Sequence, residues 1–248
     1  MIDIHNHILP SVDDGSKSWE MSVEMCRMAA ADGITHMVAS PHANDVYSYH
    51  REQHEANLAE LRTQTDGCIA LTLGCDFHLS FENVQDALAH PARYTIGTTP
   101  YLLVELSQFS VPPYMADSMM HLGSAGLRPI LTHPERNPIL QQDLEMVLRW
   151  IRQGVVMQIT ANAVTGSWGE RARRAALWLL EHRAVHVLAS DAHDTQRRVP
   201  KLSEARDLIA QTYGMELANM LVEGNPRAIV QGEPLPYFPE PLGGISRD

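Results

Sequence analysis

The sequence predicts an α/β fold, a TIM-like (β/α)7 barrel. Short apolar runs rich in β-branched residues recur along the chain, and a longer segment with helical periodicity follows most of them. Strands that alternate with helices imply right-handed crossovers and a parallel sheet, which seven or eight such units can close into a ring. The length of 248 residues suits one barrel of this kind. A doubly wound open sheet is the alternative that the same order of elements leaves open.

The predicted strands are short and mostly apolar. In chain order they are Met1–His5, Ile34–Ser40, Ile69–Gly74, Tyr101–Leu106, Arg128–Thr132, Val155–Thr160 and Val185–Ser190. The helices between them are predicted at Trp19–Asp32, Tyr49–Thr65, Phe81–His90, Tyr114–Ala125, Leu144–Gln153 and Gly169–His182. Gly33, Gly126 and Gly154 follow three of these helices, because glycine readily adopts the left-handed conformation that ends a helix.

Two helical patterns and a proline-rich segment follow the last strand. The helices are predicted at Lys201–Tyr213 and Glu216–Leu221. Residues 233–248 form a Pro/Gly-rich C-terminal tail, which we expect to be extended or disordered. The prediction is therefore one barrel domain, residues 1–232, with the tail outside it.

Composition and charge argue against several classes of function. The formal net charge is -11 and no run of lysine and arginine could follow a phosphate backbone, so nucleic acid or an anionic membrane surface is disfavoured as a partner. No segment has the pattern of a signal peptide, and no stretch approaches the roughly 18 apolar residues of a membrane span. We expect a cytoplasmic protein without direct membrane insertion.

The cysteines and lysines offer little chemistry. Cys26, Cys68 and Cys75 are odd in number and not closely paired, which argues against a disulfide framework and a thiolate zinc site. None has an arginine six positions later, where a cysteine-dependent phosphatase needs one. Lys17 and Lys201 give poor support for a Schiff-base lysine. The chemistry must come from His, Asp, Glu and Arg.

Residue types that bind metals collect at the predicted strand ends. In chain order they are His5, His7, His42, Asp76, Glu105, His133, Asp191 and His193. All strands of a parallel barrel end on one face, so these side chains should meet there. Within His5/His7 and Asp191/His193 the spacing of two places both side chains on the same side of an extended backbone. Each pair can then face one ion.

The number of candidates indicates more than one ion. Eight ligands exceed the four of a tetrahedral zinc ion, and a carboxylate such as Glu105 can bridge, so we expect two or three ions a few ångströms apart. Imidazole and carboxylate without thiolate suit manganese, iron or zinc. Asp14, in the loop SVDDGS, is a further possible ligand or proton-transfer group, although loop aspartates usually cap helices or make turns.

Five segments of the chain resemble the polymerase and histidinol phosphatase (PHP) superfamily. They are MIDIHNHILPSVDDG at the N-terminus, SPH at 40–42, VEL at 104–106, HPERN at 133–137 and SDAH at 190–193. Within this superfamily, the chain resembles the bacterial manganese-dependent protein-tyrosine phosphatases encoded with capsule or exopolysaccharide genes. The length of the chain and the segment QITANAVTG at 158–166 are also typical of that branch. The resemblance covers residue 1 to about residue 230 and leaves out the tail.

The resemblance implies a distorted barrel with a trinuclear site, most often of Mn²⁺. It implies hydrolysis, by a metal-activated water, of phosphotyrosine in the tail of a tyrosine autokinase that controls polysaccharide export. By motif, the ligands would be His5, His7, His42, Glu105, His133, Asp191 and His193. Asp76 departs from the family pattern, which has glutamate there, and its shorter side chain makes the third ion the least secure. His78 lies close by.

Arginines are the candidates for phosphate binding. Arg136 in HPER and Arg198 after SDAH can each match phosphoryl oxygens bidentately. Arg198 fits the family spacing better than Arg197. For Arg197, an ion pair with a nearby acid is about as good an interpretation as phosphate binding. Glu135 is the acid that could instead hold Arg136. Trp168, like the other tryptophans, is expected to pack helices onto the barrel.

Three other functions are compatible with the same residues. A small-molecule phosphatase of histidinol-phosphatase type would share the site, and so would a nuclease or polymerase-associated module, which the acidic balance and the lack of attached domains disfavour. A non-catalytic kinase-docking module is the alternative of a different class. A homo-oligomer is compatible with the sequence.

Overall fold

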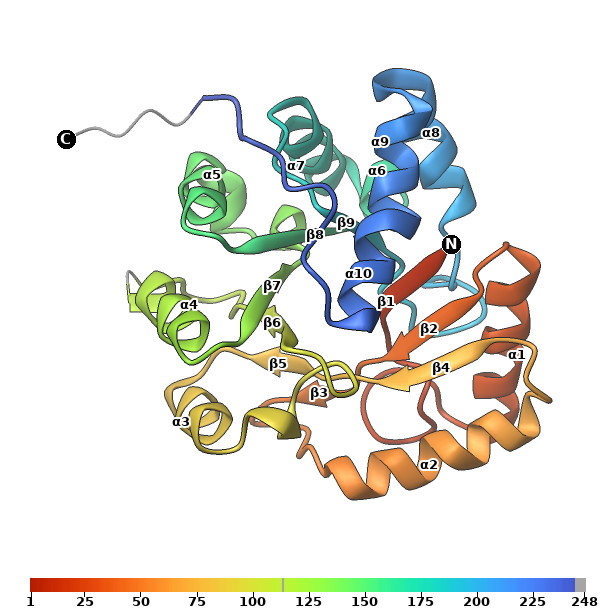
Figure 1. Ribbon diagram of the computed structural model, residues 1–248. Coiled ribbons are helices and arrows are strands. Elements are labelled where there is room, and N and C mark those ends of the chain that lie inside the picture. Colours follow the sequence, from red (N-terminus) through yellow and green to blue (C-terminus); the bar gives the residue numbers. More distant parts are fainter. Residues whose placement is uncertain (113, 244–248) are drawn as a thin grey trace.

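The structure is a computed structural model that describes residues 1–112 and 114–243. Over these ranges every strand pair is parallel, and helices lie around the outside of the ring of strands (Figure 1). The strands are β1 (Ile2–Asn6), β2 (His36–Ala39), β3 (His42–Ala43), β4 (Ala70–Leu73), β5 (Asp76–His78), β6 (Tyr101–Glu105), β7 (Arg128–Thr132), β8 (Val156–Thr160) and β9 (Val187–Ala189).

The α-helices are α1 (Trp19–Ala31), α2 (Arg51–Gln64), α3 (Phe81–Ala89), α4 (Tyr114–Ser124), α5 (Glu145–Arg152), α6 (Ala161–Thr165), α7 (Glu170–Glu181), α8 (Ser203–Tyr213), α9 (Met215–Asn219) and α10 (Asn225–Gln231). Short 3₁₀ segments cover Pro91–Arg93, Pro134–Arg136 and Leu140–Gln142, and a π-helical segment covers Met220–Gly224. None of the described helices combines the length and the apolar character needed to cross a membrane.

The strands form two sheets that together make a distorted ring. One has the order β1-β2-β4 and the other the order β3-β5-β6-β7-β8-β9. The chain passes from β2 into β3 and from β4 into β5 after short breaks, so both routes lead from the first sheet to the second. On the other side, a parallel bridge between Asn6 and Ala192 links the end of β1 to the segment after β9. The predicted α/β barrel-like architecture is confirmed.

The two breaks explain why seven strands were predicted and nine short ones are described. Pro41 lies between β2 and β3 and has no amide hydrogen to donate to a ladder. Gly74 lies between β4 and β5, where an added Cβ atom would come within 2.8 Å of Val38 Cγ1. Glycine therefore lets β4 end close against β2. The apolar pattern does not show that each strand resumes after its break.

The helices from α1 to α5, and α7, begin and end within two residues of their predicted bounds. Ser18 and Ser80 cap α1 and α3 by accepting hydrogen bonds from the amides of Met21 and Asn83, at 3.2 and 3.1 Å. Gly33 has a φ of +88°, as a glycine that ends a helix should. The short helices α6 and α10 were not predicted.

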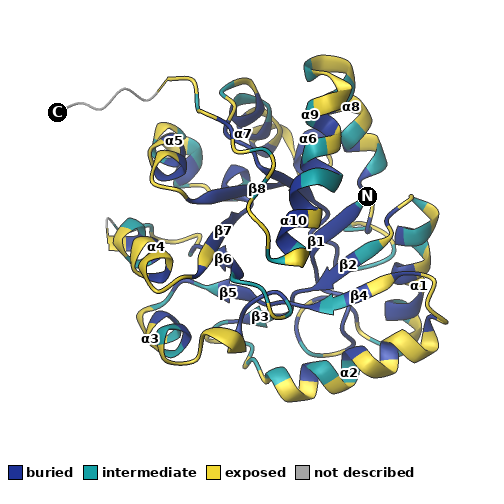
Figure 2. Cartoon of the chain, in the orientation of Figure 1, coloured by how far each residue is buried: buried dark blue, intermediate teal, exposed yellow. Residues whose placement is uncertain are grey.

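Apolar side chains fill the interior of the ring. The buried cluster there comprises Ile2, Ile4, Val38, Ile96, Tyr101, Leu103, Ile130, Val156, Val187, Ala189 and Ile229. Ile229 comes from α10, which packs against β1, and Glu233 just after α10 accepts a 2.6 Å hydrogen bond from the Tyr101 hydroxyl at the start of β6. Helix α10 therefore covers the amino-terminal end of the ring (Figure 1). Figure 2 shows buried strands and helices exposed on their outer sides.

The described part of the tail, residues 233–243, has neither helix nor strand and is held against the barrel. The Asn225 side-chain amide donates to Tyr237 O at 2.6 Å, and Leu242 N donates to His182 O at 2.9 Å. The Phe238 ring lies 4.4 Å from that of His186. The domain boundary after residue 232 stays a prediction, and residues 244–248 of the predicted tail lie outside the described residues.

Candidate metal centre

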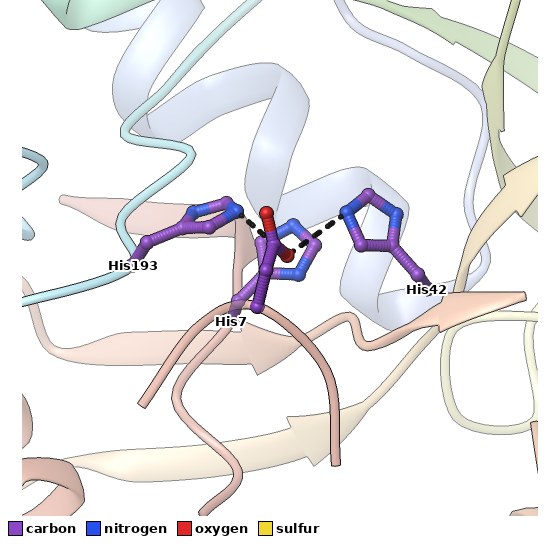
Figure 3. A group of neighbouring side chains, drawn as sticks. His7, His42 and His193 are labelled. Atoms are coloured by element: carbon purple, nitrogen blue, oxygen red, sulfur yellow. Dashed lines mark ion pairs between the residues drawn. The ribbon is translucent and has the colours of Figure 1, made fainter. Parts of the chain in front are cut away.

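The predicted metal ligands come together at the carboxyl ends of the strands. Three groups of side chains each place their ligand atoms within 4.8 Å of one another. The groups are His7, Asp14, His42 and His193; His5, His7 and Asp76; and His42, Asp76 and Glu105. His7, His42 and His193 converge from separate segments of the chain (Figure 3). Because each group shares two of its members with the others, the three form one continuous cluster.

His133 and Asp191 lie beside this cluster. His133 Nε2 is 3.7 Å from Glu105 Oε1. Asp191 Oδ1 is 3.4 Å from the Nε2 atoms of both His5 and His7. The structure thus gathers all eight residues predicted as ligands, with Asp14, in one place.

A bulge in β1 turns both histidines of the His-x-His motif into the cluster. Asp3 pairs with Met37 but Asn6 pairs with Ala39, so three steps along β1 match two along β2. Ile4 belongs to the apolar interior, and strict alternation would have pointed His5 to the opposite side. The extra residue re-aims His5, which is a known effect of bulges next to functional sites.

Two polar side chains orient these histidines. His5 Nδ1 lies 2.9 Å from Gln158 Oε1, and His7 Nδ1 lies 2.8 Å from Asp13 Oδ2. With Nδ1 held in this way, each ring presents Nε2 to the cluster, as outer partners of metal-bound histidines do. The two Nε2 atoms are 3.3 Å apart. Sequence reasoning missed both partners, although Asp13 adjoins Asp14 and Gln158 opens the segment QITANAVTG.

Asp76 provides the test of whether the cluster fits cations. Its side chain is fully buried, and neither carboxylate oxygen accepts a hydrogen bond from the described residues. The nearest nitrogen atoms are His42 Nδ1 and His5 Nε2, at 3.2 and 3.5 Å from Oδ2. A buried carboxylate in such surroundings is costly unless positive charge compensates it. The residues present therefore fit divalent ions.

The protonation of the cluster supports the same conclusion. Burial lowers the pKa of His5 and His42, but the surrounding carboxylates outweigh it and raise the pKa of His5 to about 9 and that of His42 to about 11. Burial and the charge of Asp76 raise the pKa of Glu105 to about 7. The carboxylates thus favour positive charge at the two imidazoles, as they would favour a cation. Metal binding must displace protons from the nitrogens that become ligands.

His133 and Asp191 share an uncommon backbone conformation. Their φ angles are +34° and +50°, in the left-handed region that side chains other than glycine seldom adopt. Each lies just after a strand, β7 or β9, where the chain turns sharply. Such conformations persist where the surrounding structure enforces them, most often at functional sites.

Two arginines and a tryptophan adjoin Asp191. Arg136 Nη1 and Arg198 Nη2 both donate to Asp191 Oδ2, the second at 2.6 Å. The guanidinium carbon atoms lie 3.7 and 5.1 Å from the centre of the Trp168 ring. The Nε atom of each arginine is buried and finds no acceptor among the described residues. These two donors can serve an anion at the edge of the cluster.

The positions of Trp168 and Glu135 differ from two of the interpretations that the sequence offered. The expectation that Trp168 packs a helix onto the barrel was wrong, because it lies in the turn between α6 and α7 over the arginines and is 37% exposed. Glu135 does not hold Arg136, because its carboxylate accepts from Thr160 N and Oγ1 at 2.8 and 2.7 Å. The acid that holds Arg136 is Asp191.

Gly15 lets the loop that carries Asp13 and Asp14 close over His7. An added Cβ atom would lie 2.2 Å from His7 O and 2.4 Å from His7 Cβ. We expect Gly15→Ala to lower the free energy of unfolding by about 2 kcal/mol, since backbone cannot move aside as a flexible side chain can. It should also weaken metal uptake, because the displaced loop carries Asp14. Thermal unfolding and metal titration would measure the two effects.

Gly123→Ala is the matched control for this variant. Gly123 lies in α4 with no atom near its added Cβ. Alanine favours a helix over glycine by up to about 1 kcal/mol, so this variant should keep or slightly gain stability. Equal stability and equal metal uptake in the two variants would contradict the steric role of Gly15.

A family model, capsular polysaccharide synthesis CpsB/CapC, matches residues 1–231 of the chain. The chain belongs to this family. Within the CpsB/CapC family, tyrosine-protein phosphatase YwqE from Bacillus subtilis (strain 168) is 32% identical over 228 residues, which cover 90% of this chain and 89% of YwqE. Tyrosine-protein phosphatase CpsB from Streptococcus pneumoniae is 27% identical over 242 residues, covering 94% and 99% of the two chains.

A solved CpsB/CapC-family structure confirms the fold. It comes from work on YwqE of Bacillus subtilis and CpsB of Streptococcus pneumoniae, described there as metal-dependent tyrosine phosphatases. It superposes with a TM-score of 0.90 at 30% identity and covers 98% of this chain and 100% of the other. The match confirms the resemblance that the motifs indicated. The whole cluster, including Asp14 and Trp168, lies inside the region that the CpsB/CapC model covers.

Proposed function

We propose that this protein is a metal-dependent tyrosine-protein phosphatase that hydrolyses phosphotyrosine on a bacterial tyrosine autokinase and thereby regulates capsule or exopolysaccharide synthesis. The observation that carries the proposal is the buried cluster of imidazoles and carboxylates, with the unpaired Nε donors of Arg136 and Arg198 beside it. Cation ligands next to anion donors suit a phosphate monoester. The named activity of the CpsB/CapC relatives supports the choice of phosphotyrosine.

The ligand set that we propose combines imidazole nitrogen with carboxylate oxygen. It consists of His5, His7, Asp14, His42, Asp76, Glu105, His133, Asp191 and His193. These donors suit manganese, iron or zinc, and the resemblance to manganese-dependent phosphatases makes Mn²⁺ our choice. The three overlapping groups have room for two or three ions. When bound, such ions lower the pKa of water and offset the negative charge of a phosphoryl group.

Arg136 and Arg198 are proposed to bind the substrate, and Asp14 is considered as a ligand or as a proton donor. Arg136 and Arg198 hold the phosphoryl oxygens through donors that the protein itself leaves unpaired. Burial opposes ionisation of Asp14, but hydrogen bonds from His193 and His42 outweigh it and lower the pKa of that carboxyl. Asp14 is therefore suited to hold a cation and not to donate a proton. A tyrosine oxygen with a pKa of about 10 leaves without much help from an acid.

We place the reaction in the cytoplasm, where the phosphotyrosine-bearing tail of a kinase would reach the open face of the barrel. The test is to strip the protein of metal, restore Mn²⁺, Fe or Zn, and measure the hydrolysis of p-nitrophenyl phosphate, a phosphotyrosyl peptide and histidinol phosphate. We expect turnover only with metal, greatest with Mn²⁺. We also expect kcat/KM for the peptide to exceed that for histidinol phosphate by about 10-fold or more.

Each other outcome would reject a stated part of the proposal. A preference for histidinol phosphate would indicate a small-molecule phosphatase. Metal binding without any hydrolysis would indicate the non-catalytic kinase-docking module. Unchanged turnover after complete chelation would reject a metal-dependent reaction.

A further inference from the structure

We propose that a groove next to the metal centre binds the residues that flank phosphotyrosine in an extended peptide and prefers apolar side chains there. This inference rests on the proposed function and adds to it the class of peptide that is recognised. The groove is lined by Asn44, Asp45, Val46, His78, Glu105, Leu106, Ser107, Gln108 and Phe109. Its walls are the loop after β3 and the loop after β6, with the end of β5 between them.

The groove adjoins the proposed metal centre, because Glu105 belongs to both. A smaller hollow beside it is lined in part by Arg136 and His133, and the two share Glu105, Leu106 and Gln108. With the phosphoryl group of phosphotyrosine on Arg136, we place the tyrosine ring near Glu105, beside the groove. The peptide on either side of the tyrosine would then lie between the two loops.

Two exposed apolar side chains line the groove. Phe109 is 97% exposed and Val46 is 77% exposed. A single exposed apolar residue needs no explanation, but two that line one groove leading to a catalytic cluster form a surface that a peptide can cover. Burying apolar surface against them would stabilise the bound peptide.

Both residues are presented on turns with internal hydrogen bonds. Asn44 Oδ1 accepts from the amides of Val46 and Tyr47, each at 2.9 Å. Ser107 Oγ accepts from Phe109 N at 3.2 Å. The Asn137 side chain donates to Ser107 O at 3.0 Å and so ties this loop to the HPERN segment of the site. Local hydrogen bonds in such turns favour one backbone conformation, so the backbone that carries the two apolar side chains is ordered before a peptide arrives.

The test compares two peptides and one small substrate. One peptide carries leucine on both sides of phosphotyrosine, the other carries alanine, and p-nitrophenyl phosphate reaches only the metal centre. We expect the Mn²⁺-loaded protein to prefer the leucine peptide by about 5- to 20-fold in kcat/KM. In the double variant Val46→Ala, Phe109→Ala this preference should fall to within about twofold, while kcat/KM for p-nitrophenyl phosphate stays unchanged.

Met215→Ala is the matched control, because Met215 is 55% exposed, begins α9 and does not line the groove. It should keep the leucine preference. The inference alone is overturned if the wild-type protein shows no preference, if the double variant retains it, or if the variant loses activity equally on all substrates. A wild-type protein inactive on every aryl phosphate would overturn the proposed function, and this inference with it.

Discussion

The Asp76→Asn variant is expected to lose most of its metal at limiting Mn²⁺ and to hydrolyse p-nitrophenyl phosphate at least about 100-fold less efficiently. Asparagine has nearly the same shape, so packing around the buried position is kept while the negative charge is removed. Among the described residues neither oxygen of Asp76 accepts a hydrogen bond, and the charge of Asp76 helps to raise the pKa of His5 and of His42. Metal content by mass spectrometry and kcat/KM would be measured on one preparation.

Asp76→Glu is the matched control, because it keeps the carboxylate and lengthens the side chain by one methylene group. It should keep activity and bind metal at least as tightly as the wild-type protein. His78 is the other candidate near this site, but no cation group among the described residues includes it. If both variants keep wild-type occupancy at limiting metal, Asp76 is not a ligand and His78 becomes the candidate.

The Arg136→Lys variant is expected to lower kcat/KM for aryl phosphates by about 100-fold while metal content stays near the wild-type level. Lysine can keep an ion pair with Asp191, but it lacks the Nε–H donor and the flat group that stacks on Trp168. Loss of the paired N–H donors of the guanidinium should weaken the hydrogen bonds to the phosphoryl oxygens. Kinetics, metal stoichiometry and thermal unfolding, all on one sample, would separate substrate binding from support of Asp191.

Arg197→Lys serves as the control for this variant. Arg197 is the exposed neighbour of Arg198, and its change should leave all three measurements near wild type. An Arg136→Lys protein that is unstable or poor in metal, but turns over normally per folded and loaded molecule, would show that Arg136 only supports Asp191.

The sequence predicts the candidate site better than it predicts how the site is assembled. Strand ends can be located from apolar periodicity, and parallel strands end on one face, so Glu105 and His133 could be placed together and His5 at the same end of the barrel without a structure. The bulge in β1 could not be predicted, because it depends on how β1 pairs with β2. Alternation alone points His5 away from the cluster in which it lies.

Contacts between segments distant in sequence are the other part that could not be predicted. Gln158 reaches His5 across 153 residues, and no local pattern distinguishes it from a surface glutamine. Trp168 looks like any apolar residue between two helices, yet the fold brings it over Arg136. The departure at Asp76 could be seen in the sequence, but its full burial without a hydrogen bond could not.

The filled interior of the ring gives substrate and products a single opening. Among the described residues the apolar cluster fills the ring beneath the site, and α10 covers the other end. Under the proposed mechanism the dephosphorylated peptide lies in the groove, outside the phosphate that Arg136 and Arg198 hold. The peptide must therefore dissociate first and inorganic phosphate last. Free phosphate would then compete with incoming substrate, and accumulated product would slow turnover.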